Sequence, residues 1–258
     1  MRRLVIASWD DVPHLTEEMK VAQLSTMDPH LRDARRRGIP FLGSGAVYPV
    51  PTEVIEIKPF PIPDHWVRIF GLDVGWHRTA AIWGAHDRDS DIVYLYDEHY
   101  VGEENPRSHA ESIKGSGVKS NLRAPWIPGV IDPASKGRSQ KDGEKLLETY
   151  RNLGLDLETA VNAVEAGIRE VWLRLSSGRL KVFSTLQFWF KEYLLYRRDK
   201  NGKIIESKAR PDHLMDATRY LIVSGLDKMK QPPYDMTRRE LPDWGDPELV
   251  GSQGWMSA

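Results

Sequence analysis

The pattern of apolar positions is densest between residues 67 and 101. Three apolar runs follow one another there, "VRIFGLDVG" from 67, "TAAIWGAHD" from 79 and "DIVYLYDEHYV" from 91, with short glycine-containing or charged turns between them. Apolar runs of this length, bounded by turn residues and rich in β-branched and aromatic side chains, are typical of strands. Their close spacing predicts a meander of three antiparallel strands.

After the meander, helical and strand patterns alternate along the chain. Helices are predicted at 106–115, 142–153, 161–176, 185–195 and 211–228, strands in "WIPGVIDPAS" and "RLKVFS", and a hairpin at 196–208. The hairpin has Asn201-Gly202 at its tip, the pair that favours a type I′ turn. Strands that alternate with helices imply a mixed sheet with helices on its faces, so the fold class is α/β.

The two ends of the chain do not look like complete domains. Residues 1–48 offer one short strand-like run, a helix that begins at Thr16 and a second helix that ends at Gly38, which is too little to bury a core. Five prolines in 49–65 disfavour helix, so we expect an extended linker there. The tail at 231–258 is rich in Pro, Gly and acids, which predicts flexibility. The complete domain is therefore expected at 66–230.

The composition agrees with a globular domain and limits the kinds of site. The chain has 258 residues, of which 40% are hydrophobic and 28% charged, enough for a sizeable core. It has no cysteine, which excludes disulfides and thiolate metal sites. The formal net charge of −1 gives no overall attraction to DNA, so nucleic-acid binding requires local basic patches. No apolar stretch approaches a membrane span and no signal sequence is evident, so we expect a cytoplasmic protein.

Three aspartates lie next to apolar segments, where a carboxylate is unexpected unless it is solvated, paired or bound to a metal. Asp73 and Asp132 each end an apolar strand, the place where ligands gather in open α/β sheets. Asp216 lies beside the apolar stripe of the last helix. Three acids brought together repel one another unless a cation lies between them. Ligands that are oxygens only favour Mg²⁺ or Mn²⁺, and two such ions about 4 Å apart would support phosphodiester hydrolysis.

Each acid also has a simpler interpretation. A lone aspartate at the end of a strand is more often a solvated turn residue, and Asp132 stands before a proline as turn formers do. Asp216 fits a surface pair with Lys208 or Arg219. His77 and His213 flank the acids and could steer a water, but we favour their interpretation as exposed or capping histidines. The order of the acids, two at strand ends and one on the last helix, is what favours a joint site.

The motifs around these acids resemble a known family. "GLDVG", "GVIDPAS" and "RPDHLMDATRY" together are similar to the nuclease domain of phage terminase large subunits, which belongs to the ribonuclease H-like nucleases. The resemblance covers about 66–228, and "ASWDDVPHLTEEMK" resembles the end of the terminase ATPase portion. It implies Asp73, Asp132 and Asp216 as the catalytic, metal-binding acids, with Asp212 as a fourth metal ligand one helical turn before Asp216.

The same resemblance implies an activity and partners. Members cut concatemeric double-stranded viral DNA, in which genome copies are joined end to end, during genome packaging. They use divalent metal ions. The portal protein and the small terminase subunit are the partners that the resemblance implies. No G-x-x-x-x-G-K-[ST] phosphate loop occurs in the sequence. We therefore expect that the chain does not translocate DNA alone, that it is a piece of a larger protein, and that Met1 is not necessarily the natural start.

Two basic clusters adjoin the acids in the sequence. One follows Asp132 and the other is the hairpin before Asp216, and either could be a solvated face or part of a track for DNA phosphates. Their nearness to the acids favours the phosphate track. The predicted DNA-binding residues are Lys136, Arg138, Lys141, Arg197, Arg198, Lys200 and Lys203.

Other functions remain open from the sequence. "LDVGWHRTA" also resembles the first phosphate motif of actin and sugar kinases, which suggests an ATP-dependent phosphotransferase, although no second glycine-rich loop is evident. A non-catalytic docking module, with the tail at 231–258 bound to the portal or capsid, is a further alternative. Other ribonuclease H-like enzymes, namely junction resolvases and transposases, share the same expected fold.

Overall fold

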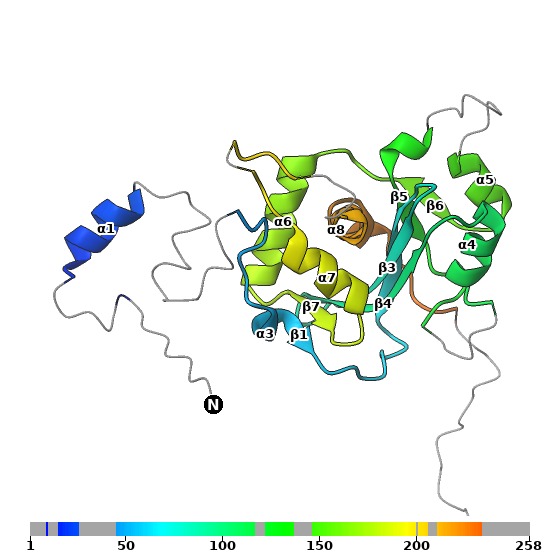
Figure 1. The fold of residues 1–258 in the computed structure, drawn as a ribbon. Helices are drawn as coiled ribbons and strands as arrows, with labels where there is room; N and C mark the ends of the chain where they lie inside the picture. The colour runs from blue at the N-terminus through cyan, green and yellow to red at the C-terminus, as the bar shows by residue number, and fades with distance from the viewer. Residues whose placement is uncertain are drawn as a thin grey trace, which may run out of the picture.

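A seven-stranded mixed sheet forms the centre of the protein (Figure 1). The computed structural model describes residues 9, 15–25, 45–116, 122–136, 146–199, 201–205 and 211–233. The strand order is β1-β7-β4-β3-β2-β5-β6. In chain order the strands are β1 (Glu56–Ile57), β2 (Val67–Asp73), β3 (Thr79–Asp87), β4 (Ile92–Val101), β5 (Gly129–Ile131), β6 (Leu157–Thr159) and β7 (Leu180–Phe183).

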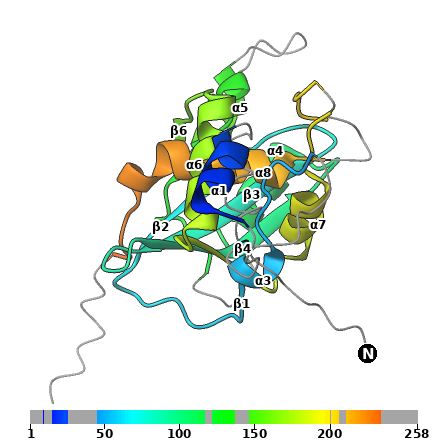
Figure 2. The ribbon, with the colours of Figure 1, turned by 90° about the vertical axis from the view of Figure 1, so that its left-hand side faces the viewer.

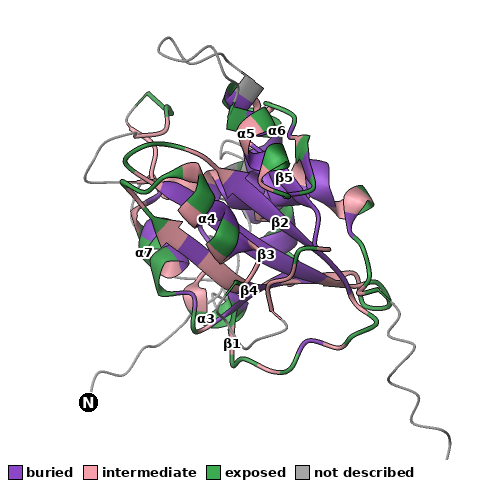
Figure 3. Ribbon diagram, turned by 90° about the vertical axis from the view of Figure 1, so that its right-hand side faces the viewer, coloured by how far each residue is buried: buried purple, intermediate pink, exposed green. Residues whose placement is uncertain are grey.

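The predicted meander is confirmed. Strands β2, β3 and β4 pair antiparallel, while β5 and β6 continue the sheet parallel to β2, and β7 and β1 continue it parallel to β4. Side chains on both faces of β2 and β3 are buried, as the purple strands of Figure 3 show. A sheet covered on both faces explains why these runs are almost continuously apolar and do not alternate with polar residues.

Helices cover the two faces of this sheet (Figures 1 and 2). One face carries α6 (Val164–Ser176), α7 (Gln187–Leu195) and α8 (His213–Tyr220), and the other carries α4 (Pro106–Ile113) and α5 (Leu146–Asn152). After α8 the helical path continues as the π-helix η3 (Leu221–Gly225) and the 3₁₀-helix η4 (Leu226–Lys228). The remaining described helical segments are α1 (Glu17–Ser25), α3 (Thr52–Ile55) and η2 (Pro133–Lys136).

The sequence explains where two of the helices begin. The side chain of Asn105 accepts a hydrogen bond of 3.0 Å from the backbone N–H of Ser108, and Pro106 occupies the first turn of α4. Thr16 accepts one of 3.3 Å from the N–H of Met19 at the start of α1, as predicted. Such side chains satisfy N–H groups that the first turn of a helix leaves without partners. No helix in the described part of the chain combines the length and hydrophobicity that a membrane crossing requires.

The proline-rich stretch at 49–65 differs from the expected extended linker. It forms the helical turn α3 and the edge strand β1, which pairs with β7, and its side chains enter the core. Ile55 is fully buried, and Val50 is nearly so. The prolines flank residues 52–57 without interrupting them, so this short segment can turn and pair. The stretch therefore packs against the sheet and is not a spacer that stands apart from it.

The hairpin at 196–208 also differs from its prediction. A turn is present, with hydrogen bonds from Asp199 N to Lys203 O and from Gly202 N to Asp199 O. Gly202 has the left-handed φ of 79°, and Asn201 donates its N–H to the Asp199 carboxylate. The predicted two-residue type I′ turn at Asn201-Gly202 was wrong, because the hydrogen bond from Gly202 N to Asp199 O closes the turn one residue earlier. Where the arms are described, at 196–199 and 201–205, they form single bridges and no regular strands.

Several predicted segments cannot be compared with the structure. The strand-like run near residue 2, the helix that ends at Gly38 and the tail from 234 lie outside the described residues. The predicted helices and strands elsewhere are present, with ends shifted by a few residues. Strands β1 and β6 were not predicted, since two or three residues are too few to show a periodic pattern.

Helix α8 packs directly on strand β2. A Cβ atom at Gly71, in the middle of the strand, would overlap the carbonyl oxygen of Ala217 on α8. The two backbones therefore meet where only glycine fits. On the neighbouring strand, a Cβ at Gly84 would come within 3.0 Å of the Leu221 side chain. Glycines on two adjacent strands thus allow this helical segment to pack closely against the sheet.

Gly71→Ala should force α8 away from the sheet and destabilise the fold by about 3 kcal/mol or more, because the added methyl meets backbone that has no rotamer to change. Gly84→Ala is the matched control and should lose only about 1 kcal/mol, since the Leu221 side chain can move aside. Chemical denaturation of both variants measures the difference. Equal losses in the two variants would contradict the proposed role of the Gly71 contact.

A pair of buried histidines joins β4 to α4. The Nε2 atom of His99 and the Nδ1 atom of His109 are 3.0 Å apart, so one ring donates to the other. Burial, together with the positive charge that His109 and Arg123 can carry, lowers the pKa of His99 to about 4. The pair is thus held neutral at physiological pH.

The histidine pair should make the protein sensitive to acid. The unfolded chain takes up a proton at His99 near pH 6.5 and the folded chain only near 4, so the stability present above pH 6.5 is lost as the pH falls toward 4. The slope should be up to about 1.4 kcal/mol per pH unit in that window. His99→Gln should flatten the profile, and the same change at the exposed His65 should not. Denaturation curves from pH 7 to 4 provide the test.

Candidate active site

Asp73 and Asp132 lie next to each other at one edge of the sheet. Asp73 is the last residue of β2, and Asp132 follows β5, the parallel neighbour of β2. Leu72 and Ile131 are paired in register, and the N–H of Asp132 donates a 2.9 Å hydrogen bond to the carbonyl of Leu72. Neighbouring strands are about 4.8 Å apart, so the two aspartates occupy adjacent positions at the strand ends.

Helix α8 brings Asp216 to the same edge. Alternate residues of a strand face the same side, so Asp73 shares the face on which Gly71 meets Ala217. Asp216 immediately precedes Ala217 on the helix. Burial is the main cause that raises the pKa of Asp216, and the nearby charges of Asp73 and Asp132 raise it further.

The electrostatics of the site oppose three negative charges. Burial, and secondarily the charge of Asp132, raises the pKa of Asp73, against a hydrogen bond from His213 that lowers it. Burial is also the main cause that raises the pKa of Asp216, against Arg219. The fold therefore holds carboxylates where ionisation is unfavourable, an arrangement found at functional sites. A cation among them would relieve both the burial and the repulsion.

Each carboxylate has a protein partner from α8. Asp73 Oδ2 lies 2.8 Å from His213 Nδ1, the hydroxyl of Tyr220 donates to Asp132 Oδ1 over 3.2 Å, and Arg219 lies 3.0 Å from Asp216 Oδ1. The described residues hold no group of three His, Cys, Asp or Glu side chains already arranged around a metal position. The carboxylate oxygens fit a hard divalent cation by their chemistry. Each of these contacts involves one oxygen of its carboxylate, so a cation would bind at the other oxygen without breaking them.

His213 is a site residue that the sequence analysis misinterpreted. It was taken as an exposed or capping histidine, but it is half-buried and bonded to Asp73, and this bond raises the pKa of His213. Tyr220 was not predicted as a partner of the acids. The pair of Asp216 with Arg219, which was the simpler interpretation of Asp216, is present, but Arg219 is buried and the pair is not a surface one. The available signal was the spacing of His213 and Asp216, which lie three residues apart on one helix face.

Asp212 stands at the N-terminal cap of α8. Its carbonyl accepts the N–H of Asp216 over 2.8 Å, and its side chain makes no capping hydrogen bond. The charge of Asp212 contributes to the raised pKa of His213. Asp212 is therefore in electrostatic reach of the histidine that binds Asp73, and its role as a fourth ligand stays a prediction.

The predicted basic residues are placed unequally. In the hairpin, Arg197 is half-buried and Lys203 is exposed. Arg198 makes a two-pronged ion pair with Glu165, over 2.9 and 2.7 Å, so its charge is already matched by a protein carboxylate. Lys136 ends η2, four residues after Asp132. The side chain of Lys136, and all of Arg138, Lys141 and Lys200, lie outside the described residues.

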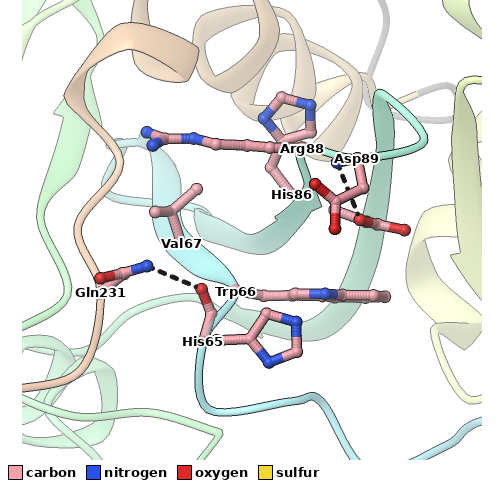
Figure 4. A pocket seen from close by; sticks show the side chains of 8 residues that line it. His65, Trp66, Val67, His86, Arg88, Asp89 and Gln231 are labelled. Atoms are coloured by element: carbon pink, nitrogen blue, oxygen red, sulfur yellow. Dashed lines mark hydrogen bonds between the residues drawn. The ribbon is translucent and has the colours of Figure 1, made fainter.

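Two cavities of the described structure lie away from the acids. One is lined by Trp66, Val67 and Arg88, with Arg88 above the plane of Trp66 (Figure 4). The other surrounds Gly129 and neighbouring charged residues. Val67 and Gly129 begin the strands whose far ends lead to Asp73 and Asp132, so about 20 Å of β2 separates the first cavity from the acids. The three acids thus lie at a different edge of the sheet from both cavities.

Comparison with known proteins identifies relatives of this arrangement. The model of the terminase RNaseH-like domain family matches residues 70–224, which is more than half of the chain and includes all three acids. A terminase large subunit of Enterobacteria phage LP7 is 34% identical over 218 residues, 81% of this chain and 44% of the relative. The chain therefore spans less than half the length of this curated relative.

Solved structures show the same fold. The nuclease domain of the P22 large terminase superposes with a TM-score of 0.60 at 33% identity, covering 70% of this chain and 93% of that domain. The large terminase nuclease of the thermophilic phage G20c with bound magnesium gives a TM-score of 0.50 at 13% identity, over 69% and 97% of the two chains. At that identity the second likeness concerns the fold alone.

Asp73→Asn tests whether the acids are held together against their repulsion. The variant removes one buried charge and keeps the side-chain shape, so without added metal it should melt at the same temperature or up to about 3 °C higher. It should also lose most of the stabilisation that Mn²⁺ gives the parent protein, because a ligand that binds the folded state stabilises by mass action. Thermal melting with and without Mn²⁺ measures both effects.

Asp87→Asn is the control for this measurement. Asp87 is a half-buried aspartate at the far end of β3, and a hydrogen bond from Ser90 lowers its pKa, so its replacement should leave the effect of Mn²⁺ unchanged. A clearly destabilised Asp73→Asn variant that responds to Mn²⁺ as the parent does would rule out the proposed site.

Proposed function

This chain belongs to the terminase RNaseH-like domain family, and from that membership we propose that it is a metal-dependent endonuclease. Its proposed substrate is concatemeric double-stranded viral DNA, cut during genome packaging in the cytoplasm of the host cell. The observation that carries the proposal is the convergence of Asp73, Asp132 and Asp216 at one edge of the sheet, on two parallel strands and the helix packed against them.

The three acids are proposed as the metal ligands, with Asp212 as a fourth. Oxygen ligands suit Mg²⁺ or Mn²⁺, and the G20c nuclease with bound magnesium supports this choice of metal. Two such ions would activate the attacking water and stabilise the leaving oxygen of the phosphodiester. In this proposal, the hydrogen bonds from His213 and Tyr220 orient the Asp73 and Asp132 carboxylates, and Arg219 restrains Asp216.

DNA binding is proposed to depend on phosphate contacts near these acids. Arg197 and Lys203 on the hairpin are the described candidates, while Arg198 would hold the hairpin in place through its pair with Glu165. Contacts to phosphate carry no sequence information, so little sequence preference is expected. The remaining proposed contacts are Lys136, Arg138, Lys141 and Lys200.

The whole protein's organisation is part of the proposal. We infer a nuclease domain at 66–230, preceded by the end of an ATPase portion at 1–48 and its connection at 49–65, and followed by the tail at 231–258. Portal protein and small terminase subunit are the proposed protein partners. The family assignment favours this function over an ATP-dependent phosphotransferase, and a docking role of the tail is compatible with it.

Digestion of plasmid DNA tests the proposed activity. The protein should cut DNA in Mn²⁺ or Mg²⁺, and excess EDTA should abolish cutting. Asp132→Asn should lower the rate by about 100-fold or more, because it removes an anionic ligand beside the metals. Asp87→Asn should cut as the parent protein does, since that side chain is at the other end of the sheet from the acids. Cutting that persists in EDTA would contradict metal-dependent hydrolysis.

A further inference from the structure

The loop between β2 and β3 exposes a tryptophan beside the candidate active site. Trp76 is 68% exposed, whereas every other tryptophan in the described part of the chain is buried or half-buried. Tryptophan is usually highly buried, so an exposed indole is informative in a way that an exposed leucine is not. Trp76 follows Asp73 by three residues, which places its Cα within about 11 Å of that of Asp73.

The backbone beneath this side chain is fixed. The carbonyl of Trp76 accepts a 2.9 Å hydrogen bond from the N–H of Glu103, and the Thr79 hydroxyl donates to the carbonyl of Gly75. A Cβ at Gly102 would overlap the carbonyl of His77, so this loop rests directly on the backbone that follows β4. The indole therefore extends from a loop with a defined position relative to Asp73.

The side chains around Trp76 suit a nucleic acid better than an apolar protein surface. The guanidinium of Arg78 lies 4.6 Å from the ring centre of Tyr100, which holds a positive charge beside the loop. Tyr100 in turn stacks on Phe188, with ring centres 4.9 Å apart, and packs near His213 of the acid cluster. An exposed indole with an arginine two residues further along the same loop offers a stacking surface for a base and a contact for its phosphate.

The short distance between the acids and the β2–β3 loop brings Trp76 within reach of DNA bound for cleavage. When a phosphodiester lies at the three acids, nucleotides a few steps along the DNA are within reach of the β2–β3 loop, because base pairs are about 3.4 Å apart along the helix axis and the loop lies within about 11 Å. We propose that the indole of Trp76 contacts a base of the bound DNA next to the scissile phosphodiester, partly unstacking it, and so positions the strand over the acids. This inference rests on the proposed nuclease function.

A contact of this kind has a distinctive signature. Base–aromatic stacking tolerates any sequence, since every base has a π-face, and loss of such a contact by alanine substitution weakens binding by about 5-fold to 150-fold. The indole carries no charge and displaces no counterion from phosphate. The dependence of affinity on salt should therefore stay the same when it is removed, whereas loss of a lysine or arginine contact lowers the slope by about 0.9.

The test measures binding to a duplex of about 30 base pairs in an Asp132→Asn background, which keeps the DNA intact. Trp76→Ala should weaken binding at least about 5-fold with an unchanged salt slope, and Trp76→Phe should stay within about 3-fold of its parent. Val54→Ala, at an apolar side chain that is 46% exposed on α3, is the matched control and should bind normally. Arg197→Ala provides the comparison for a charged contact.

Cleavage and melting complete the experiment. With Asp132 restored, Trp76→Ala should cut plasmid DNA more slowly than Trp76→Phe, while both melt within about 2 °C of the parent protein because the side chain is exposed. If Asp132→Asn abolishes cutting but Trp76→Ala binds and cuts DNA as the parent does, the nuclease function stands and the role of Trp76 is overturned. The same result would follow if the indole docked only a protein partner. If the variants of the three acids still cut DNA as the parent does, the nuclease function itself is overturned.

Discussion

The contact between the backbones of α8 and β2 is the constraint on which the site depends. Gly71 lets the Ala217 carbonyl approach the strand more closely than any side chain would permit. Asp73 lies two residues beyond this contact on the strand, and Asp216 lies one residue before it on the helix. The separation of the two acids is therefore set by a backbone contact in the core. A surface site built on loops would lack this precision, because loops are more mobile than the elements they connect.

Helix α8 contributes more to the site than one acid. His213, Arg219 and Tyr220, on or next to the turns that carry Asp216, contact the three carboxylates. Helix α8 thus contributes one of the three carboxylates and also the side chains that donate hydrogen bonds to, or pair with, all three. Arg219 is itself buried, and its stem occupies the space left free by Gly167 on α6. The docking of α8 between the sheet and α6 therefore couples the assembly of the site to the completion of the fold.

Features that depend on residues close together in the sequence could be predicted, and features that depend on distant residues could not. The meander, the long helices and the strand-end positions of Asp73 and Asp132 depend on patterns within a few residues of each element. Strand β1 depends instead on pairing with β7, far along the chain. The bond of His213 with Asp73 joins residues 140 positions apart, so no local pattern encodes it. The turn at Asn201 was mispredicted because the Asp199 side chain, and not the Asn-Gly pair, determines its hydrogen bonds.

The charges explain why an uncharged contact is useful at this site. DNA phosphates must approach three carboxylates, and the chain as a whole carries a net charge of −1. Arg198, which the sequence presents as a free cation, is matched by Glu165 and adds little attraction. Among the described basic residues of the hairpin, fewer are therefore available to phosphate than the sequence suggests, and each ionic contact also weakens as salt rises. A stacking contact at Trp76 is not subject to either limit. The proposed track accordingly combines cations on the hairpin with an aromatic surface close to the acids, where phosphate alone would be repelled.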